Sequence, residues 1–200
     1  IGAWVLMSAC REAMRWPDSL FVGVNVSALQ FEQGDLLAAV GEALRHSGLA
    51  PHRLEIEVTE SALLTNPDTT LATLRQLRDQ GVRIAMDDFG TGYSSLTRLQ
   101  SFPFDKIKID RSFVSGGRGM AEGRAIVRAI AGLGASLGMR TIAEGVETIE
   151  QLDAVRNEGC QEVQGYLFGR PTPAEGLGDV IARFAPSELA PSCPEPACSA

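Results

Sequence analysis

The expected fold depends most on residues 54–60, which read Leu54-Glu55-Ile56-Glu57-Val58-Thr59-Glu60. Large aliphatic residues alternate here with acidic or hydroxylated ones, so an extended chain would have one apolar and one polar face. The same alternation returns in Phe21–Ser27 and in Lys106–Asp110. Strands of an open, doubly wound parallel sheet are apolar on both faces. The pattern therefore favours a barrel with helices around its outside and an unusually polar interior.

Apolar runs of strand length alternate along the whole chain with stretches of helical periodicity. The expected strands are Phe21–Ser27, Leu54–Thr59, Val82–Met86, Lys106–Ile109, Thr141–Ala143 and Val163–Phe168. The expected helices are Ala3–Arg15, Glu32–Ser47, Asp68–Gln80, Ala121–Leu137, Thr148–Asn157 and Ala174–Phe184. Strand and helix in strict alternation are typical of a parallel α/β protein.

We predict an α/β fold of the TIM-like (β/α) barrel type that lacks the first two strands. A closed barrel of this type has eight strands in about 250 residues, whereas this chain has 200 residues and six expected strands. Because the chain starts with Ile1 rather than Met, we expect it to be a piece of a longer protein, with the missing part N-terminal. Residues 1–184 are then the C-terminal three-quarters of the barrel domain. Residues 185–200, rich in Pro, Ser and Ala, are expected to be a disordered tail.

The composition excludes several classes of partner and location. The net charge of −7 argues against a nucleic-acid polymer as ligand. No apolar run reaches the roughly 18 residues that a membrane-spanning helix needs, and no signal-peptide pattern is present. The four cysteines are scattered rather than clustered. We expect a cytoplasmic protein, or the cytoplasmic domain of a longer one.

Polar side chains gather at the expected C-terminal strand ends, where barrel enzymes place their catalytic residues. They are Asn25, Glu57, Glu60, Asp87, Asp88, Lys108, Asp110, Glu144, Glu147 and Gln164. So many carboxylates at one mouth repel one another unless cations compensate. Oxygen ligands without Cys or His nearby favour Mg²⁺ or Mn²⁺, with Ca²⁺ as an alternative. The sequence thus predicts a metal site, with two ions, and a phosphate-bearing substrate.

The strongest local signal is the adjacent pair Asp87-Asp88, which closes the apolar run Val82–Met86. Two such carboxylates repel by about 1 kcal/mol at ~4 Å in water, and by more where the dielectric constant is lower. The loop that follows contains Gly90 and Gly92, which allow its backbone to rearrange. A strand end of this kind indicates a bound cation.

Taken together, these stretches resemble the EAL domain, and the resemblance covers about residues 1–184. They are Asn25-Val26-Ser27, Glu57-Val58-Thr59-Glu60, Asp87-Asp88-Phe89-Gly90-Thr91-Gly92-Tyr93-Ser94-Ser95-Leu96, Lys108-Ile109-Asp110, Glu144-Gly145-Val146-Glu147 and Gln164-Gly165-Tyr166. The resemblance implies a metal-dependent phosphodiesterase that hydrolyses the bacterial second messenger cyclic di-GMP to linear pGpG.

The resemblance also implies a set of metal ligands. Asn25, Glu57 and Asp87 would bind a metal ion, and Asp88 would bind the second ion. Asp110 would join the same network of ligands.

Five further residues receive roles from the resemblance. Glu144 would be the general base that takes a proton from the attacking water, and Lys108 would hold that water or the developing charge on phosphorus. Gln164 would contact the substrate. Glu60 would hold the glycine-containing loop, Phe89–Leu96, in position, with Glu147 close to the site. This loop contributes to dimerisation in the family, so the resemblance implies a homodimer formed through the barrel.

One departure from the family pattern leaves the activity of this chain open. The Glu-Ala-Leu motif on an early strand, whose glutamate is a metal ligand, is missing, and we expect it upstream of Ile1 together with a regulatory domain. Glu42-Ala43-Leu44 spells the same letters, but it lies in an expected helix and follows Asn25, so we interpret it as coincidence. The alternative is therefore a catalytically inactive module that binds cyclic di-GMP or another protein. A different metal-dependent barrel hydrolase is a third hypothesis.

Overall fold

The structure is a computed structural model that describes residues 1–32, 35–90, 99, 102, 104–115 and 119–184. Most of the expected loop Phe89–Leu96, from residue 91 on, and the expected tail 185–200 lie outside these described residues. The chain divides into two compact units, Ile1–Arg170 and Pro171–Ala200. The strands all belong to the first unit.

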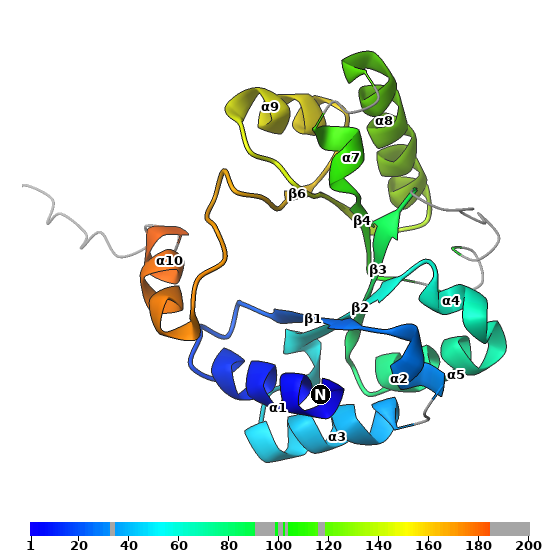
Figure 1. The fold of residues 1–200 in the computed structure, drawn as a ribbon, viewed down its shortest axis with the longest axis vertical. Helices are drawn as coiled ribbons and strands as arrows, with labels where there is room; N and C mark the ends of the chain where they lie inside the picture. The colour runs from blue at the N-terminus through cyan, green and yellow to red at the C-terminus, as the bar shows by residue number, and fades with distance from the viewer. Residues whose placement is uncertain (33–34, 91–98, 100–101, 103, 116–118, 185–200) are drawn as a thin grey trace, which may run out of the picture. The chain divides into compact units, whose positions relative to one another are not determined.

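Six parallel strands form one sheet, and each pairs with the next strand along the chain. They are β1 (Val22–Val26), β2 (Leu54–Thr59), β3 (Arg83–Phe89), β4 (Lys106–Ile109), β5 (Arg140–Ala143) and β6 (Glu162–Val163). Among these described strands the order never reverses, as it would at the switch point of a doubly wound sheet. The consecutive order is that of a (β/α) barrel wall (Figure 1) and confirms the predicted fold class.

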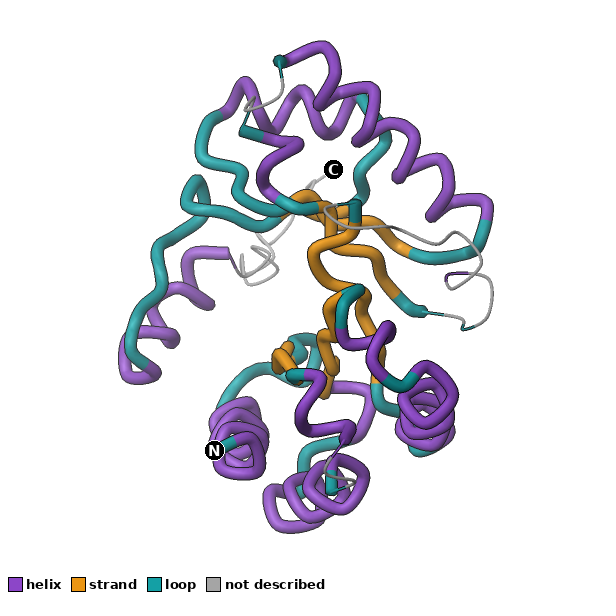
Figure 2. The backbone as a smooth tube through the Cα atoms, turned by 45° about the vertical axis from the view of Figure 1, so that its right-hand side comes forward, coloured by secondary structure: helices purple, strands orange, loops and turns teal. Residues whose placement is uncertain are grey.

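Helices of the first unit cover the outer face of this sheet, as Figure 2 shows in purple around the orange strands. They are α1 (Gly2–Ala13), α2 (Ala28–Glu32), α3 (Leu36–Ser47), α4 (Ala62–Thr65), α5 (Pro67–Asp79), α7 (Arg111–Val114), α8 (Met120–Ser136) and α9 (Ile149–Asn157), with the short 3₁₀ helix η1 (Pro51–Arg53). The second unit contains the 3₁₀ turn η2 (Ala174–Gly176) and helix α10 (Leu177–Phe184). No described helix combines the length and apolar composition needed to cross a membrane.

The hydrophobic core lies between the helices and the outward side chains of the strands. These alternate residues are almost completely buried, and they include Val24, Val26, Ile56, Val58, Ile84, Met86, Ile107 and Ile109. Each contributes about 1.5–3 kcal/mol on burial. Because side chains alternate, packing this face turns the intervening polar residues inward, as the sequence predicts.

Several element boundaries differ from the prediction; β3, for example, continues to Phe89 rather than ending at Met86. The sixth strand ends at Val163 instead of Phe168, because the chain turns at Gly165. In this turn the N–H of Phe168 donates to the Gly165 carbonyl. The backbone at Gly165 also lies so close to Val146 that a Cβ there would be 2.1 Å from the Val146 carbonyl oxygen. In place of the helix expected from Glu32 to Ser47 there are two helices, α2, which ends at Glu32, and α3, which starts at Leu36. The first of them starts directly after β1, where Gln30 accepts hydrogen bonds from the N–H and hydroxyl of Ser27.

Arg53 ties the connection between α1 and β1 to the start of β2. Its side chain is buried, with 5% exposure, although it carries a charge. The guanidinium pairs with Asp18 at 2.9 Å and donates to four backbone carbonyls, those of Ala13, Trp16, Pro17 and Leu20, at 2.7–3.3 Å. Guanidinium alone offers five donors in a rigid fork, so no other side chain can replace it.

We expect the substitution Arg53→Met to lower the free energy of unfolding by about 3 kcal/mol, because it leaves several buried carbonyl groups without donors. Urea denaturation measures this change. The matched control is Arg15→Met, since Arg15 is exposed and, within the described part of the chain, its ion pair is with Glu12. Its effect should stay within about 0.5 kcal/mol, and equal effects of the two substitutions would contradict the role of Arg53.

Candidate functional site

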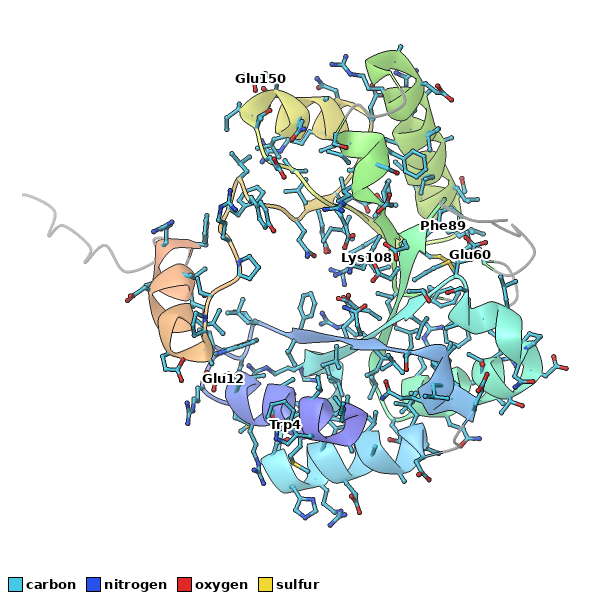
Figure 3. All side chains as sticks on the ribbon, in the orientation of Figure 1. Trp4, Glu12, Glu60, Phe89, Lys108 and Glu150 are labelled. Carbon is cyan, nitrogen blue, oxygen red and sulfur yellow. The ribbon has the colours of Figure 1, made fainter. Side chains whose placement is uncertain are left out.

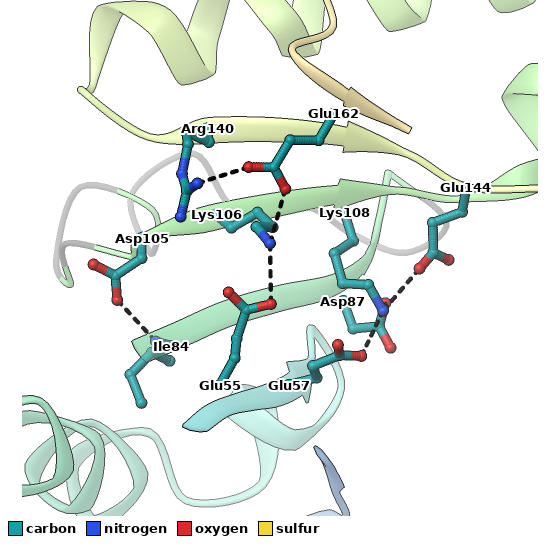
Figure 4. Close-up of polar contacts among 10 residues, drawn as sticks. All are labelled: Glu55, Glu57, Ile84, Asp87, Asp105, Lys106, Lys108, Arg140, Glu144 and Glu162. Carbon is teal, nitrogen blue, oxygen red and sulfur yellow. Dashed lines mark hydrogen bonds and ion pairs between the residues drawn. The ribbon is translucent and has the colours of Figure 1, made fainter. Parts of the chain in front are cut away.

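Lys108 lies at the centre of a charged cluster on the inner face of the sheet (Figure 4). Its Nζ contacts Glu57 Oε2 at 2.5 Å, Glu144 Oε1 at 2.7 Å and Asp87 Oδ1 at 3.0 Å. These partners come from β2, β3 and the residue after β5, so neighbouring strands converge on one ammonium group. Figure 3 shows Lys108 inside the curve of the sheet, whereas Trp4 and Glu150 lie on the outer helices.

This cluster carries an excess of negative charge, with one ammonium against three carboxylates. Burial alone would lower the pKa of Lys108, but the hydrogen bonds to Glu144 and Glu57 outweigh it and raise the pKa well above its ordinary value. The lysine therefore stays protonated. For Glu144, burial and the nearby charges of Asp87 and Glu57 raise the pKa, although Lys108 opposes this shift. The site as a whole is short of positive charge.

Asp87, Asp88 and Glu144 form a candidate metal site. Each offers one carboxylate oxygen, and these oxygens all lie within 4.8 Å of one another. Burial first, and then the charges of Asp87 and Asp110, raise the pKa of Asp88, while Lys108 opposes this shift. Oxygen-only ligands with unbalanced negative charge fit a hard divalent cation such as Mg²⁺, Mn²⁺ or Ca²⁺.

A break in the strand pattern lets the two adjacent aspartates approach the same point. In a regular strand Asp87 and Asp88 would face opposite sides. Here the pairing between β3 and β4 shifts register between Met86 and Phe89, and Asp88 has a left-handed backbone with φ of 54°. Such a φ is uncommon outside glycine, although Asp tolerates it better than most residues. Gly90, two residues further on, also has a positive φ, of 96°.

A second charged layer lies two residues along the strands from the first. Lys106 Nζ contacts Glu55 at 3.2 Å and Glu162 at 2.9 Å, and Arg140 contacts Glu162 at 2.8 Å. The ring of Phe21 lies 4.5 Å from the same ammonium. The sequence analysis missed this layer, although a sequence signal for it existed in the i, i+2 repeats Glu55/Glu57 and Lys106/Lys108.

Both layers line a cavity of about 630 Å³ on the inner face. The upper part is lined by Glu57, Lys108 and Gln164, and Lys106 and Glu162 line the lower part. Gln164 is exposed there, which leaves its amide accessible to a ligand. The volume is sufficient for a small-molecule ligand.

Of the other predicted ligands, Asn25 and Asp110 lie at the same end of the sheet. Asn25 pairs in register with Glu57 across β1 and β2, and its side chain is exposed. Asp110 directly follows β4 and accepts a hydrogen bond from the N–H of Ser112 at 3.0 Å. After burial and Asp87, its charge is a smaller cause of the raised pKa of Asp88.

The two residues predicted to position the loop differ in their placement. Glu60 lies just beyond β2 and is 6% exposed, but the loop residues from 91 on that it would hold are outside the described part of the chain. Glu147 is exposed, and its backbone N–H donates to Gln151 Oε1 at 2.7 Å as part of the start of α9. Its carboxylate makes no ion pair with any described residue, so the structure does not bring it into the cluster around Lys108.

Comparison with known proteins assigns the family. The model of the EAL domain matches residues 1–171. The bifunctional diguanylate cyclase/cyclic di-GMP phosphodiesterase MucR of Pseudomonas aeruginosa is 45% identical over 181 residues, which are 88% of this chain and 26% of that protein. The cyclic di-GMP phosphodiesterase NbdA of the same organism is 41% identical over 90% of this chain and 24% of its own length. The chain thus spans about a quarter of these curated relatives.

Solved structures agree with this assignment. The PaMucR phosphodiesterase in complex with c-di-GMP superposes with a TM-score of 0.83 at 44% identity, over 88% of this chain and 73% of that one. BlrP1 of Klebsiella pneumoniae, solved with cy-diGMP and calcium, has a TM-score of 0.78 at 32% identity, over 85% of this chain and 44% of that one. The same protein was also solved with manganese. By its matched family model and by its relatives, this chain belongs to the EAL domain family.

Proposed function

We propose that this chain is the catalytic part of a metal-dependent phosphodiesterase that hydrolyses cyclic di-GMP to linear pGpG. The observation that carries the proposal is the convergence of Glu57, Asp87 and Glu144 on Lys108. Beside it lies the carboxylate triad Asp87, Asp88 and Glu144, which fits a divalent cation. Relatives named as cyclic di-GMP phosphodiesterases and the c-di-GMP complex of PaMucR support the choice of substrate. The complexes of BlrP1 with calcium and manganese support a divalent metal.

We assign the metal to the carboxylate triad and its neighbours. Asp87, Asp88 and Glu144 would hold one Mg²⁺ or Mn²⁺, while Asn25 and Glu57 offer ligands for a second ion that Asp87 shares. When bound, such ions polarise the phosphoryl oxygens and make water more acidic. The triad includes Glu144, which the sequence analysis treated as a base, so this carboxylate can act as a ligand as well as a proton acceptor.

The remaining roles follow from charge and position. The Lys108 ammonium lies on the cavity surface and can donate hydrogen bonds to a phosphoryl oxygen as negative charge develops there. The Glu144 carboxylate, 2.7 Å from that ammonium, is placed to accept a proton from a water between it and the phosphorus. The exposed amide of Gln164 offers both donors and acceptors to a guanine or phosphate group.

Three further predictions concern the natural protein: a homodimer formed through the barrel, an upstream regulatory domain and a cytoplasmic location. The relatives named above are about four times as long as the part they share with this chain, which supports additional domains. We retain all three as proposals.

We expect the protein, as its gene encodes it, to release pGpG from cyclic di-GMP when Mg²⁺ or Mn²⁺ is present. Chelation with EDTA should abolish the reaction, and added Mn²⁺ should restore it. Chromatography of the nucleotides measures substrate and product together. Binding of cyclic di-GMP without any pGpG would instead support the inactive binding module.

The substitution Glu144→Gln should lower kcat by at least about 10²-fold, because a positioned general base contributes roughly 10²–10⁴-fold. The glutamine keeps the size of the side chain but can neither accept the proton nor bind a cation strongly. The matched control is Glu150→Gln on the outer face of α9, labelled in Figure 3, which should keep full activity. Equal activities of the two variants would exclude the proposed role of Glu144.

The substitution Lys108→Met should separate metal binding from catalysis. Removing the ammonium leaves Glu57, Asp87 and Glu144 without their shared cation, so the affinity for Mn²⁺ should stay the same or increase. Turnover should fall by about 10²-fold or more, because the charge that develops on phosphorus is no longer compensated. Calorimetric titration with Mn²⁺ and the pGpG assay measure the two effects. Loss of Mn²⁺ binding in parallel with turnover would contradict this role.

A further inference from the structure

The aromatic ring of Phe113 packs directly against the backbone of Gly90, next to the acidic pair at the end of β3. A Cβ atom at Gly90 would lie 3.0 Å from Phe113 Cε2, 3.2 Å from its Cζ and 3.6 Å from Ile130 Cδ1. The ring therefore occupies the space that a side chain at position 90 would need. Since Gly90 is two residues beyond Asp88, the contact reaches the strand end that carries the metal ligands.

Phe113 belongs to helix α7, which is fixed by Asp110 at its start and by close packing against α8. It lies in α7, where its N–H donates to the Asp110 carbonyl at 3.1 Å and the Asp110 side chain caps the helix start. On the other side α8 approaches closely, because a Cβ at Gly123 would lie 2.5 Å from the Phe113 carbonyl oxygen. With 4% exposure, the ring has a fixed position from which it can support the turn.

The acidic pair depends on an unusual backbone path. Asp87 and Asp88 approach one point only because the strand shifts register and Asp88 takes a φ of 54°. A turn in such a conformation relaxes toward a commoner one unless its surroundings prevent it. Phe113 lies where that support is needed, at the residue where the turn ends.

We propose that Phe113 is a positioning residue: it keeps the turn Asp87–Gly90 in the conformation that brings both carboxylates to the metal. The inference rests on the proposed function, because it takes Asp87 and Asp88 as the metal ligands. Phe113 touches neither metal nor substrate itself. It acts from the outer side of the sheet, behind the residues that do.

A cavity lies next to the Phe113 ring. Phe113 also lines a cavity of about 280 Å³ between α7, α8 and α9, together with Val127 and Val155. Shortening the Phe113 side chain would extend a space that already exists and would remove the two nearest atoms of the Gly90 contact, leaving Ile130 at a larger distance. The turn would then lose the larger part of this support.

The test is the affinity for Mn²⁺, measured by calorimetry and by the electron paramagnetic resonance spectrum of the bound ion. Residues that orient metal ligands typically change metal affinity by 10–100-fold when replaced. We expect Phe113→Ala to weaken Mn²⁺ binding within this range and Phe113→Leu to weaken it less. The matched control is Val155→Ala, since Val155 is also 4% exposed and enlarges the same cavity without contacting Gly90. Its affinity should stay within about twofold of the parent protein.

The outcomes separate this inference from the proposed function. If the parent protein binds no Mn²⁺, the proposed function fails. If the parent binds Mn²⁺ and Phe113→Ala weakens binding no more than Val155→Ala, the inference fails and the proposed function stands. Circular dichroism checks that each variant is folded. Should Phe113→Ala unfold, the comparison of Phe113→Leu with Val155→Ala decides in the same way.

Discussion

The interaction on which the site depends is the sharing of one buried ammonium by three carboxylates. Lys108 is 5% exposed at its side chain, and its partners Glu57, Asp87 and Glu144 are 11–17% exposed. Charges this deep are costly unless they are paired. Lys108 offsets part of the repulsion among the acids gathered at the sheet's inner face. One positive charge cannot balance three negative ones. The net negative charge that remains would attract a divalent cation.

Because side chains of a β-strand share a face every two residues, the same pairing of charges recurs one level further along the sheet. Residues two apart share a face, so Glu55 and Glu57 on β2 meet Lys106 and Lys108 on β4 at successive levels. A slip of one residue in β4 would turn Lys106 and Lys108 into the apolar layer beneath the helices and bring Ile107 inward. The lower pair thus fixes the register that the upper pair needs, and the polar interior specifies the fold as well as the chemistry.

Much of this arrangement could be predicted from the alternation of residue types. Strand β2 and strand β4 have the predicted bounds, and the acids at the strand ends converge as expected, because alternation and parallel pairing are local rules. The turn at Gly165 could not be predicted, since it depends on contact with Val146, far away in the sequence. The exposed position of Glu147 instead goes with a local contact, the hydrogen bond from its N–H to Gln151 at the start of α9. Only the first case depends on a contact between distant segments.

The acidic pair shows why a functional site can require a break in these local rules. Alternation alone would separate Asp87 and Asp88 onto opposite faces, and only one of them could then reach a metal in the interior. Bringing both to one point needs a register shift and a left-handed residue, and each costs stability. A conformation of this kind persists only where its surroundings enforce it. On the outer face the Phe113 ring meets Gly90, which is why we propose that it supports this turn. The proposed metal site then depends on the packing of the outer face as well as on its carboxylates.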